Sequence, residues 1–154
     1  MRGQDSAAHP PPFALILGFA GLIPFAAAAL SQWLQLPAFT PQMGLATGTA
    51  YGAVILSFLG GIRWGTAMKT FGNERLDLEL SGSVLAALAG WLSLALQPVT
   101  GLCLLIAGFL LLALWDVISV ERNHLPRWYG KFRMLLTAGA VLSLGAMLVH
   151  LTIS

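Results

Sequence analysis

The chain has 154 residues, of which 57% are hydrophobic and 9% are charged, and its formal net charge at pH 7 is +2. Soluble domains usually carry about 25% charged residues, so this composition excludes an ordinary water-soluble domain. Abundant apolar residues and a small net charge also exclude an intrinsically disordered chain. A mean hydropathy of +0.80 therefore indicates an integral membrane protein of one domain.

Charged residues leave three long uncharged stretches, at 6–62, 80–115 and 134–154. A helical membrane crossing needs about 20 apolar residues, so these stretches hold two crossings, two crossings and one crossing. Lipid-spanning barrels need alternating segments of about ten residues, which argues against strands. The sequence predicts an all-α membrane protein, a five-helix transmembrane bundle forming a single domain over 1–154. In chain order the expected helices cover 13–34, 42–68, 78–96, 99–120 and 131–153.

The first expected helix contains Pro24, three residues after Gly21. Proline removes a backbone donor, and its ring clashes with the carbonyl four residues earlier, here that of Ala20. We therefore predict a helix kink at Gly21 and Pro24. Broken helices line substrate-binding sites in some transporters, but many membrane helices contain proline for structural reasons alone. A kink that binds no ligand is the favoured interpretation.

The second expected helix carries glycines at four-residue spacing, which places them on one face. Removing side chains along a face lets another backbone approach closely, and lipid supplies no hydrophobic drive for helix association. We expect this helix to be central within the chain, with a homodimer contact as the alternative. The leucine-rich helix at 99–120 is expected to be peripheral and lipid-exposed. The packing glycines are Gly44, Gly48, Gly52 and Gly60.

All eight Lys and Arg residues lie near the amino terminus or around the connections after the second and fourth helices. Positively charged short loops stay in the cytoplasm. We therefore expect the amino terminus to be cytoplasmic and the carboxyl terminus to be outside. A cleaved signal peptide over 13–26, before the alanines at 27–29, is disfavoured because Pro24 interrupts it and one basic residue precedes it.

Two ionisable residues lie inside the cytoplasmic ends of helices. Arg63 is six residues before Lys69, and Asp116 is six residues before Arg122. At 1.5 Å per residue, each lies about 9 Å deeper than its loop charge. Equal depth and opposite charge predict an ion pair, which lowers the cost of either charge near hydrocarbon. Other residues expected at this depth are Trp64, Trp115, Trp128, Tyr129, Arg127, Lys131 and Arg133.

These aromatic and basic residues also have an ordinary explanation, because Trp and Tyr form interfacial belts while Arg and Lys snorkel to headgroups. An acidic residue inside a membrane helix does not belong to such an interfacial belt. Asp116 therefore has two possible interpretations, as a structural partner in an ion pair or as a functional residue. Glu121 and His124 have the spacing found in di-iron bundles, but no second pair exists, and we predict no metal site. The lone Cys103 allows neither an intrachain disulfide nor a cysteine metal site.

The leading hypothesis is a non-enzymatic bundle that binds the head of an amphipathic ligand, such as a lipid, quinone or tetrapyrrole, near the cytoplasmic interface. No catalytic residues are predicted, because the sequence shows no nucleophile–base set. No nucleic-acid partner is predicted, because the basic residues lie in the loops expected on the cytoplasmic side of the membrane. There are two alternatives: an accessory or assembly subunit of a larger membrane complex, and a small transporter. The sequence specifies no cofactor. The expected ligand-binding residues are Arg63, Trp64, Asp116, Trp128, Tyr129 and Arg133.

The segment 51–65 contains the run Leu-Ser-Phe-Leu-Gly-Gly-Ile-Arg-Trp-Gly at 56–65. Together with Gly-Leu-Ile-Pro-Phe at 21–25, Pro-Arg-Trp-Tyr at 126–129 and Arg133, it resembles the family of unknown function that includes mitochondrial transmembrane protein 69 and bacterial relatives. The resemblance implies an inner-membrane setting and no established activity. Because the start lacks an Arg- and Ser-rich transit segment, we expect the bacterial inner membrane. Length and helix count are also similar to the translocator protein family, whose loop signature is not evident.

Overall fold

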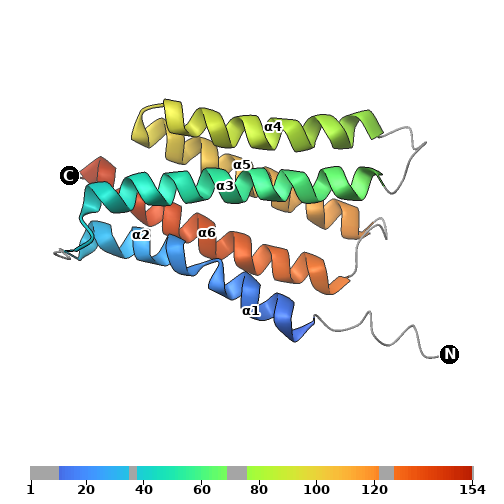
Figure 1. Cartoon of the computed structure of the whole chain (residues 1–154), viewed down its shortest axis with the longest axis horizontal. Coiled ribbons are helices and arrows are strands. Elements are labelled where there is room, and N and C mark those ends of the chain that lie inside the picture. Colours follow the sequence, from blue (N-terminus) through green and yellow to red (C-terminus); the bar gives the residue numbers. More distant parts are fainter. Residues whose placement is uncertain (1–10, 35–37, 69–75, 122–126, 154) are drawn as a thin grey trace.

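The computed structural model describes residues 11–34, 38–68, 76–121 and 127–153. The first crossing is divided between two short helices, so that five spans in the described residues are long and apolar enough to cross a membrane. The predicted five-helix, all-α membrane bundle is confirmed, and the protein is a multi-pass membrane protein (Figure 1). The helices are α1 (Pro12–Ala20), α2 (Ile23–Trp33), α3 (Pro41–Ala67), α4 (Leu76–Ala95), α5 (Pro98–Glu121) and α6 (Arg127–Ile153).

The helix bounds differ from the expected ones mainly where proline or charge marks the end of a crossing. α3 begins at Pro41, and Thr40 caps it by accepting a hydrogen bond from the Met43 amide at 3.3 Å. Proline suits this first position because the first-turn amides have no intrahelical partner. α6 begins at Arg127, four residues before the expected start at Lys131, since a helix can continue into the headgroup region beyond its apolar stretch.

The first crossing is interrupted between α1 and α2. Gly21 and Leu22 form a turn, and Pro24 lies in the first turn of α2, where its missing amide donor has no cost. The Gly21 carbonyl accepts a hydrogen bond from the Tyr51 hydroxyl of α3 at 2.9 Å. The break therefore separates two helical segments, and α3 supplies a partner for one of the exposed carbonyls.

α3 lies at the centre of the bundle, packed against α2, α4, α5 and α6. A Cβ added at Gly48 would lie 2.7 Å from the Ala28 Cβ of α2, and one at Gly60 would lie 2.6 Å from the Ser83 carbonyl oxygen of α4. The Ser83 hydroxyl also donates to the Gly60 carbonyl at 2.6 Å. Gly44 and Gly52 are buried on the same helix. The glycine-lined helix thus contacts neighbours within this chain.

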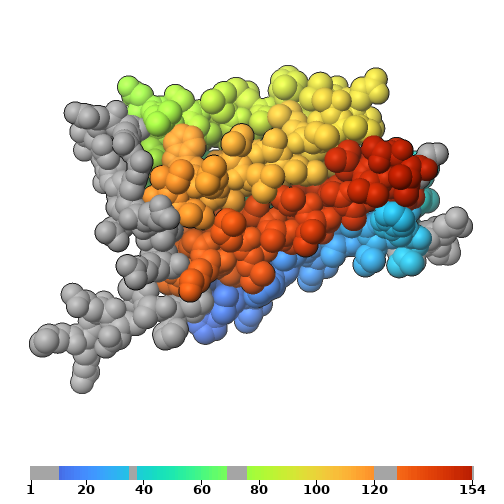
Figure 2. Space-filling model, turned by 180° about the vertical axis from the view of Figure 1, so that it is seen from behind, coloured from blue at the N-terminus to red at the C-terminus, as the bar shows by residue number. Residues whose placement is uncertain are grey.

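The expectation that the helix at 99–120 is peripheral is wrong. In α5, 39% of the spanning window is buried, against 17% to 33% in the other spans. Leu102, Leu105 and Phe109 are fully enclosed, whereas Leu110 and Leu111 are exposed. Leucine suits both lipid and the protein interior, so a high leucine content does not show which face a helix buries. Figure 2 shows α5 and α6 side by side on the face opposite to that seen in Figure 1.

Candidate functional site

An ionic network joins α3, α4, α5 and α6 inside one end of the bundle. The Arg63 guanidinium donates through Nη1 to Asp116 Oδ1 at 2.7 Å and through Nη2 to Glu79 Oε2 at 2.5 Å. Arg133 donates through Nε to Asp116 Oδ2 at 2.8 Å. The Asp116 carboxylate is therefore shared by two guanidinium groups. We call this set the ionic network: Arg63, Glu79, Asp116 and Arg133.

The ionic network is electrically balanced, because it contains two guanidinium groups and two carboxylates. Arg63, Asp116 and Arg133 are buried, while Glu79 is partly exposed. A buried charge is tolerated only with partners of opposite sign, and leaving one unpaired costs about 3–5 kcal/mol. Each of the four helices supplies one charge, so the network fixes their positions relative to one another.

Two polar neighbours hold Arg63 and Glu79 in place. The Trp115 indole nitrogen donates to Glu79 Oε1 at 3.2 Å, and the Arg63 guanidinium lies 4.6 Å from the centre of the Trp115 ring. The Ser119 hydroxyl accepts from Arg63 Nη2 at 3.3 Å and donates to the Trp115 carbonyl at 2.9 Å. The indole face thus stabilises the cation while its N–H stabilises the neighbouring carboxylate.

The six residues expected to bind a ligand do not all meet. Arg63, Asp116 and Arg133 are members of the ionic network, and Tyr129 lines a small space of about 20 Å³ beside it. Trp128 packs edge-to-face on Tyr129, with ring centres 6.0 Å apart. Trp64 does not join them: its side chain is 43% exposed. Successive residues differ in direction by about 100° around a helix, so a buried Arg63 turns its neighbour outward.

Sequence reasoning did not select Glu79, Trp115 or Ser119 as site residues. Glu79 lies just before the uncharged stretch at 80–115, at the start of the expected helix over 78–96, and in the structure it belongs to the first turn of α4. Ser119 follows Asp116 by three residues and therefore shares its helix face. That spacing was a usable signal, whereas the position of Glu79 depends on how α4 is set against α3.

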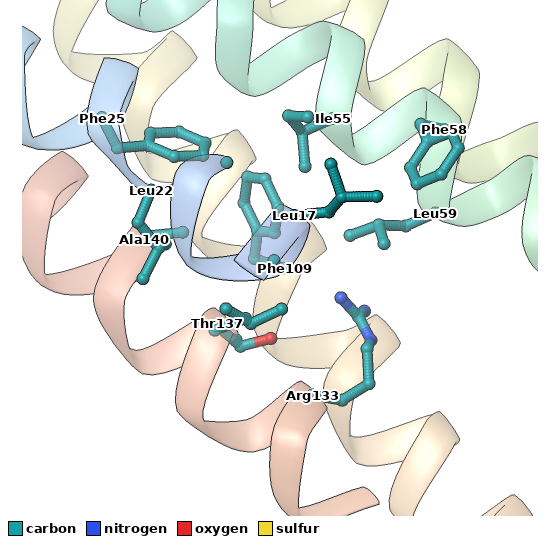
Figure 3. A pocket seen from close by; sticks show the side chains of 13 residues that line it. Leu17, Leu22, Phe25, Ile55, Phe58, Leu59, Phe109, Arg133, Thr137 and Ala140 are labelled. Carbon is teal, nitrogen blue, oxygen red and sulfur yellow. The ribbon is translucent and has the colours of Figure 1, made fainter. Parts of the chain in front are cut away.

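An apolar cavity of about 150 Å³ lies next to the ionic network, where the broken first crossing meets α3, α5 and α6. Arg133 belongs to both features, since its Nε contacts Asp116 while its side chain lines the cavity. Figure 3 shows the guanidinium nitrogens pointing toward Leu17 and Leu59. Other lining residues are Leu22, Phe25, Ile55, Phe58, Phe109, Thr137 and Ala140.

Two polar atoms at this cavity, Arg133 Nη2 and Thr137 Oγ1, are buried and have no hydrogen-bond partner among the described residues. Other hydroxyls inside the helices behave differently. Those of Thr49, Ser57 and Ser143 each donate to the carbonyl four residues back, at 2.8 to 2.9 Å. An unpaired buried polar group costs about 1–3 kcal/mol. Two residues that line the cavity from α6 therefore carry unused hydrogen-bonding capacity.

The described residues bring together no group of three His, Cys, Asp or Glu side chains that could hold a metal ion. Glu121 and His124 have the spacing of a di-iron pair, but the Glu121 side chain and His124 lie outside what the structure describes. Cys103, the one cysteine in the sequence, is exposed on α5.

The fold and the site define a small polytopic helical membrane protein with a buried ionic network beside an apolar cavity. The chain belongs to the family described as "Protein of unknown function (DUF3429)", which matches residues 10–149. The resemblance indicated by the 56–65 segment is confirmed. Transmembrane protein 69 of Xenopus tropicalis is 37% identical over 139 residues, which cover 89% of this chain and 54% of that protein.

A second relative, Transmembrane protein 69 of Mus musculus, is 32% identical over 139 residues, covering 88% of this chain and 55% of that protein. The chain thus spans about half the length of these curated relatives. No solved structure matches the chain.

Proposed function

We propose that this protein is a non-enzymatic membrane bundle that binds an amphipathic small molecule beside the ionic network. One observation carries the proposal: Arg133 and Thr137 line an apolar cavity, and each carries a buried polar atom, Arg133 Nη2 or Thr137 Oγ1, that has no partner among the described residues. Sites for small molecules typically combine mostly apolar walls with a few polar groups that orient the ligand. The apolar part of the ligand would fill the cavity, and its polar head would face Arg133 and Thr137.

The position of the head differs from the one expected from sequence. Arg63 Nη1 and Asp116 Oδ1 are paired, and although Arg63 Nε has no partner among the described residues, the space against these side chains is only about 20 Å³. Arg133 links the ionic network to the cavity of about 150 Å³, so it is the residue best placed to contact a ligand there. A cavity of about 150 Å³ accommodates a benzene-sized ring. This size favours part of a lipid or a quinone over a tetrapyrrole.

We further propose that the amino terminus and this end of the bundle face the cytoplasm, in the inner membrane of a bacterium. The start of α1, the ends of α3 and α5 and the start of α6 lie at one end of the bundle (Figure 1). Arg63 and Arg133 lie on the parts of α3 and α6 near that end. Positive charge near short loops favours the cytoplasmic side.

The test is to purify the full chain gently and identify co-purifying small molecules by mass spectrometry. Ala140→Phe places a ring in the cavity, and we expect it to reduce the bound molecule at least fivefold. Ala107→Phe, the same change at an exposed position of α5, is the matched control. A milder variant, Ala140→Leu, serves if the phenylalanine disturbs folding. Equal recovery from the wild type and from correctly folded Ala140 variants would overturn the proposal.

The same preparation distinguishes the two alternatives. An accessory subunit would co-purify with a second protein in fixed ratio, and a monodisperse 16.3 kDa chain in one detergent micelle would contradict that role. A transporter would move its ligand across the membrane of reconstituted vesicles, whereas a binding protein would retain it without flux.

A further inference from the structure

The geometry points to an uncharged, carbonyl-bearing ring with an apolar tail, of the quinone type, as the ligand of the cavity between α1, α3, α5 and α6. This inference rests on the proposed function and names the chemistry of its ligand. It follows from three properties of the cavity: which hydrogen-bonding groups it offers, how the adjacent charges are balanced, and where it opens.

The wall formed by α6 offers hydrogen-bond donors. A guanidinium nitrogen can only donate, and a threonine hydroxyl can donate as well as accept. Arg133 and Thr137 are four residues apart and therefore lie on the same helix face. Both are more than nine-tenths buried, and Arg133 Nη2 and Thr137 Oγ1 have no partner among the described residues. An acceptor oxygen on the ligand, such as a carbonyl, would satisfy both groups.

The charge balance favours a neutral acceptor over an anion. The Arg133 cation is already paired with Asp116 at 2.8 Å, and the described ionic network contains two positive and two negative groups. A carboxylate or phosphate in the cavity would add an uncompensated negative charge among apolar side chains, where an unpaired charge is costly. A carbonyl oxygen accepts the same hydrogen bonds without this penalty.

The size and lining of the cavity fit one ring. Its volume is about 150 Å³, which a benzene-sized molecule fills. Two of its walls are aromatic, Phe25 and Phe109, whose ring centres are 5.8 Å apart in an edge-to-face arrangement. Aromatic faces and edges give a planar ring favourable contacts in addition to burial.

The cavity opens toward lipid. Leu17 of α1 and Phe58 of α3 both line it, yet their side chains are 57% and 62% exposed. They lie within spans that are apolar enough to cross the membrane, so the opening between them faces the hydrocarbon region. A molecule with a long apolar tail could therefore enter sideways from the bilayer and leave its tail in lipid.

Three probes with a planar six-membered ring and the same decyl tail test this inference: decyl-1,4-benzoquinone, decylbenzene and 4-decylbenzoate. Their affinities for the full chain are measured by equilibrium dialysis in one mild detergent. We expect the quinone to bind about tenfold more tightly than either comparison probe, as one or two buried hydrogen bonds imply. Thr137→Val preserves side-chain shape and should weaken quinone binding about fivefold while leaving decylbenzene unchanged. Thr152→Val, at an exposed position of the same helix, is the matched control.

Each other outcome overturns a defined part of the inference. Equal affinity for the quinone and decylbenzene would show that the site does not recognise a carbonyl group. Tighter binding of the benzoate would show that the ligand is not uncharged. Displacement of the quinone by a lower concentration of dioleoylglycerol would assign the carbonyl to an ester lipid and reject the ring. If no probe binds but a small molecule still co-purifies in a manner that depends on Ala140, this inference fails and the proposed function stands. If no probe binds and no small molecule co-purifies, the inference and the proposed function both fail.

Discussion

Arg63 and Asp116 are 53 positions apart in the sequence, yet their side chains meet at 2.7 Å inside the bundle. Arg133 binds the other oxygen of the same carboxylate at 2.8 Å. Asp116 thus has a structural role as the acid that joins α3, α5 and α6. Because Arg133 also lines the adjoining cavity, the network orients the residue that we propose to contact a ligand.

Neutralising Asp116 should destabilise the protein. Asp116→Asn keeps the side-chain shape but removes the charge that compensates two buried guanidinium groups. We expect the free energy of unfolding, measured by denaturant titration in detergent, to fall by about 3 kcal/mol. Asp77→Asn, at an exposed position in the first turn of α4, should change it by less than about 1 kcal/mol. Similar effects of the two substitutions would show that the buried pairs contribute little.

Adding a methyl group at Gly60 should separate α3 from α4. A Cβ there would lie 2.6 Å from the Ser83 carbonyl oxygen and 3.1 Å from the Ala86 Cβ, so the backbones must move apart. We expect Gly60→Ala to lower the free energy of unfolding by about 1–3 kcal/mol.

The adjacent Gly61→Ala is the control, because an added Cβ meets nothing within 4 Å among the described atoms. It should be neutral or slightly stabilising, since alanine restricts the unfolded chain and favours the helix. Comparable loss of stability in both variants would contradict the close packing of α3 on α4.

Removing the Tyr51 hydroxyl should loosen the break in the first crossing. Tyr51→Phe eliminates the hydrogen bond to the Gly21 carbonyl while keeping the ring that packs on Phe25, with ring centres 5.0 Å apart. We expect a loss of about 1 kcal/mol in the free energy of unfolding. Hydrogen exchange should accelerate at the amides of Leu22 and Ala26. Unchanged exchange at both would show that Tyr51 does not stabilise the break.

The proposed orientation predicts opposite labelling of the two ends of α6. Lys131 and Thr152 are both exposed, near its start and its end. In a Cys103→Ala background, a membrane-impermeant thiol reagent added outside intact cells should label Thr152→Cys and leave Lys131→Cys unmodified. Labelling of Lys131→Cys alone would show that the protein has the opposite orientation in the membrane. Labelling in lysed cells confirms that both positions are reactive.

The number and approximate bounds of the crossings were predictable because each depends on a local stretch of sequence. A crossing must match a hydrocarbon layer about 30 Å thick, so uncharged length alone sets how many helices fit. The break near Gly21 and Pro24 was also predictable, because the missing amide of proline acts on its own helix. The ion pair of Arg63 and Asp116 was predictable as well, because counting residues to the next loop charge gives the two residues equal depth and they carry opposite charges.

Only the tertiary structure decided which helix faces meet. The direction of Trp64, the burial of α5, the inclusion of Glu79 in the network and the cavity beside Arg133 all depend on helix rotation and packing. Lipid and protein interior are both apolar, so composition cannot distinguish a lipid-facing leucine from a buried one. Sequence therefore determined how the chain spans the membrane, and close packing between helices determined where its polar side chains converge.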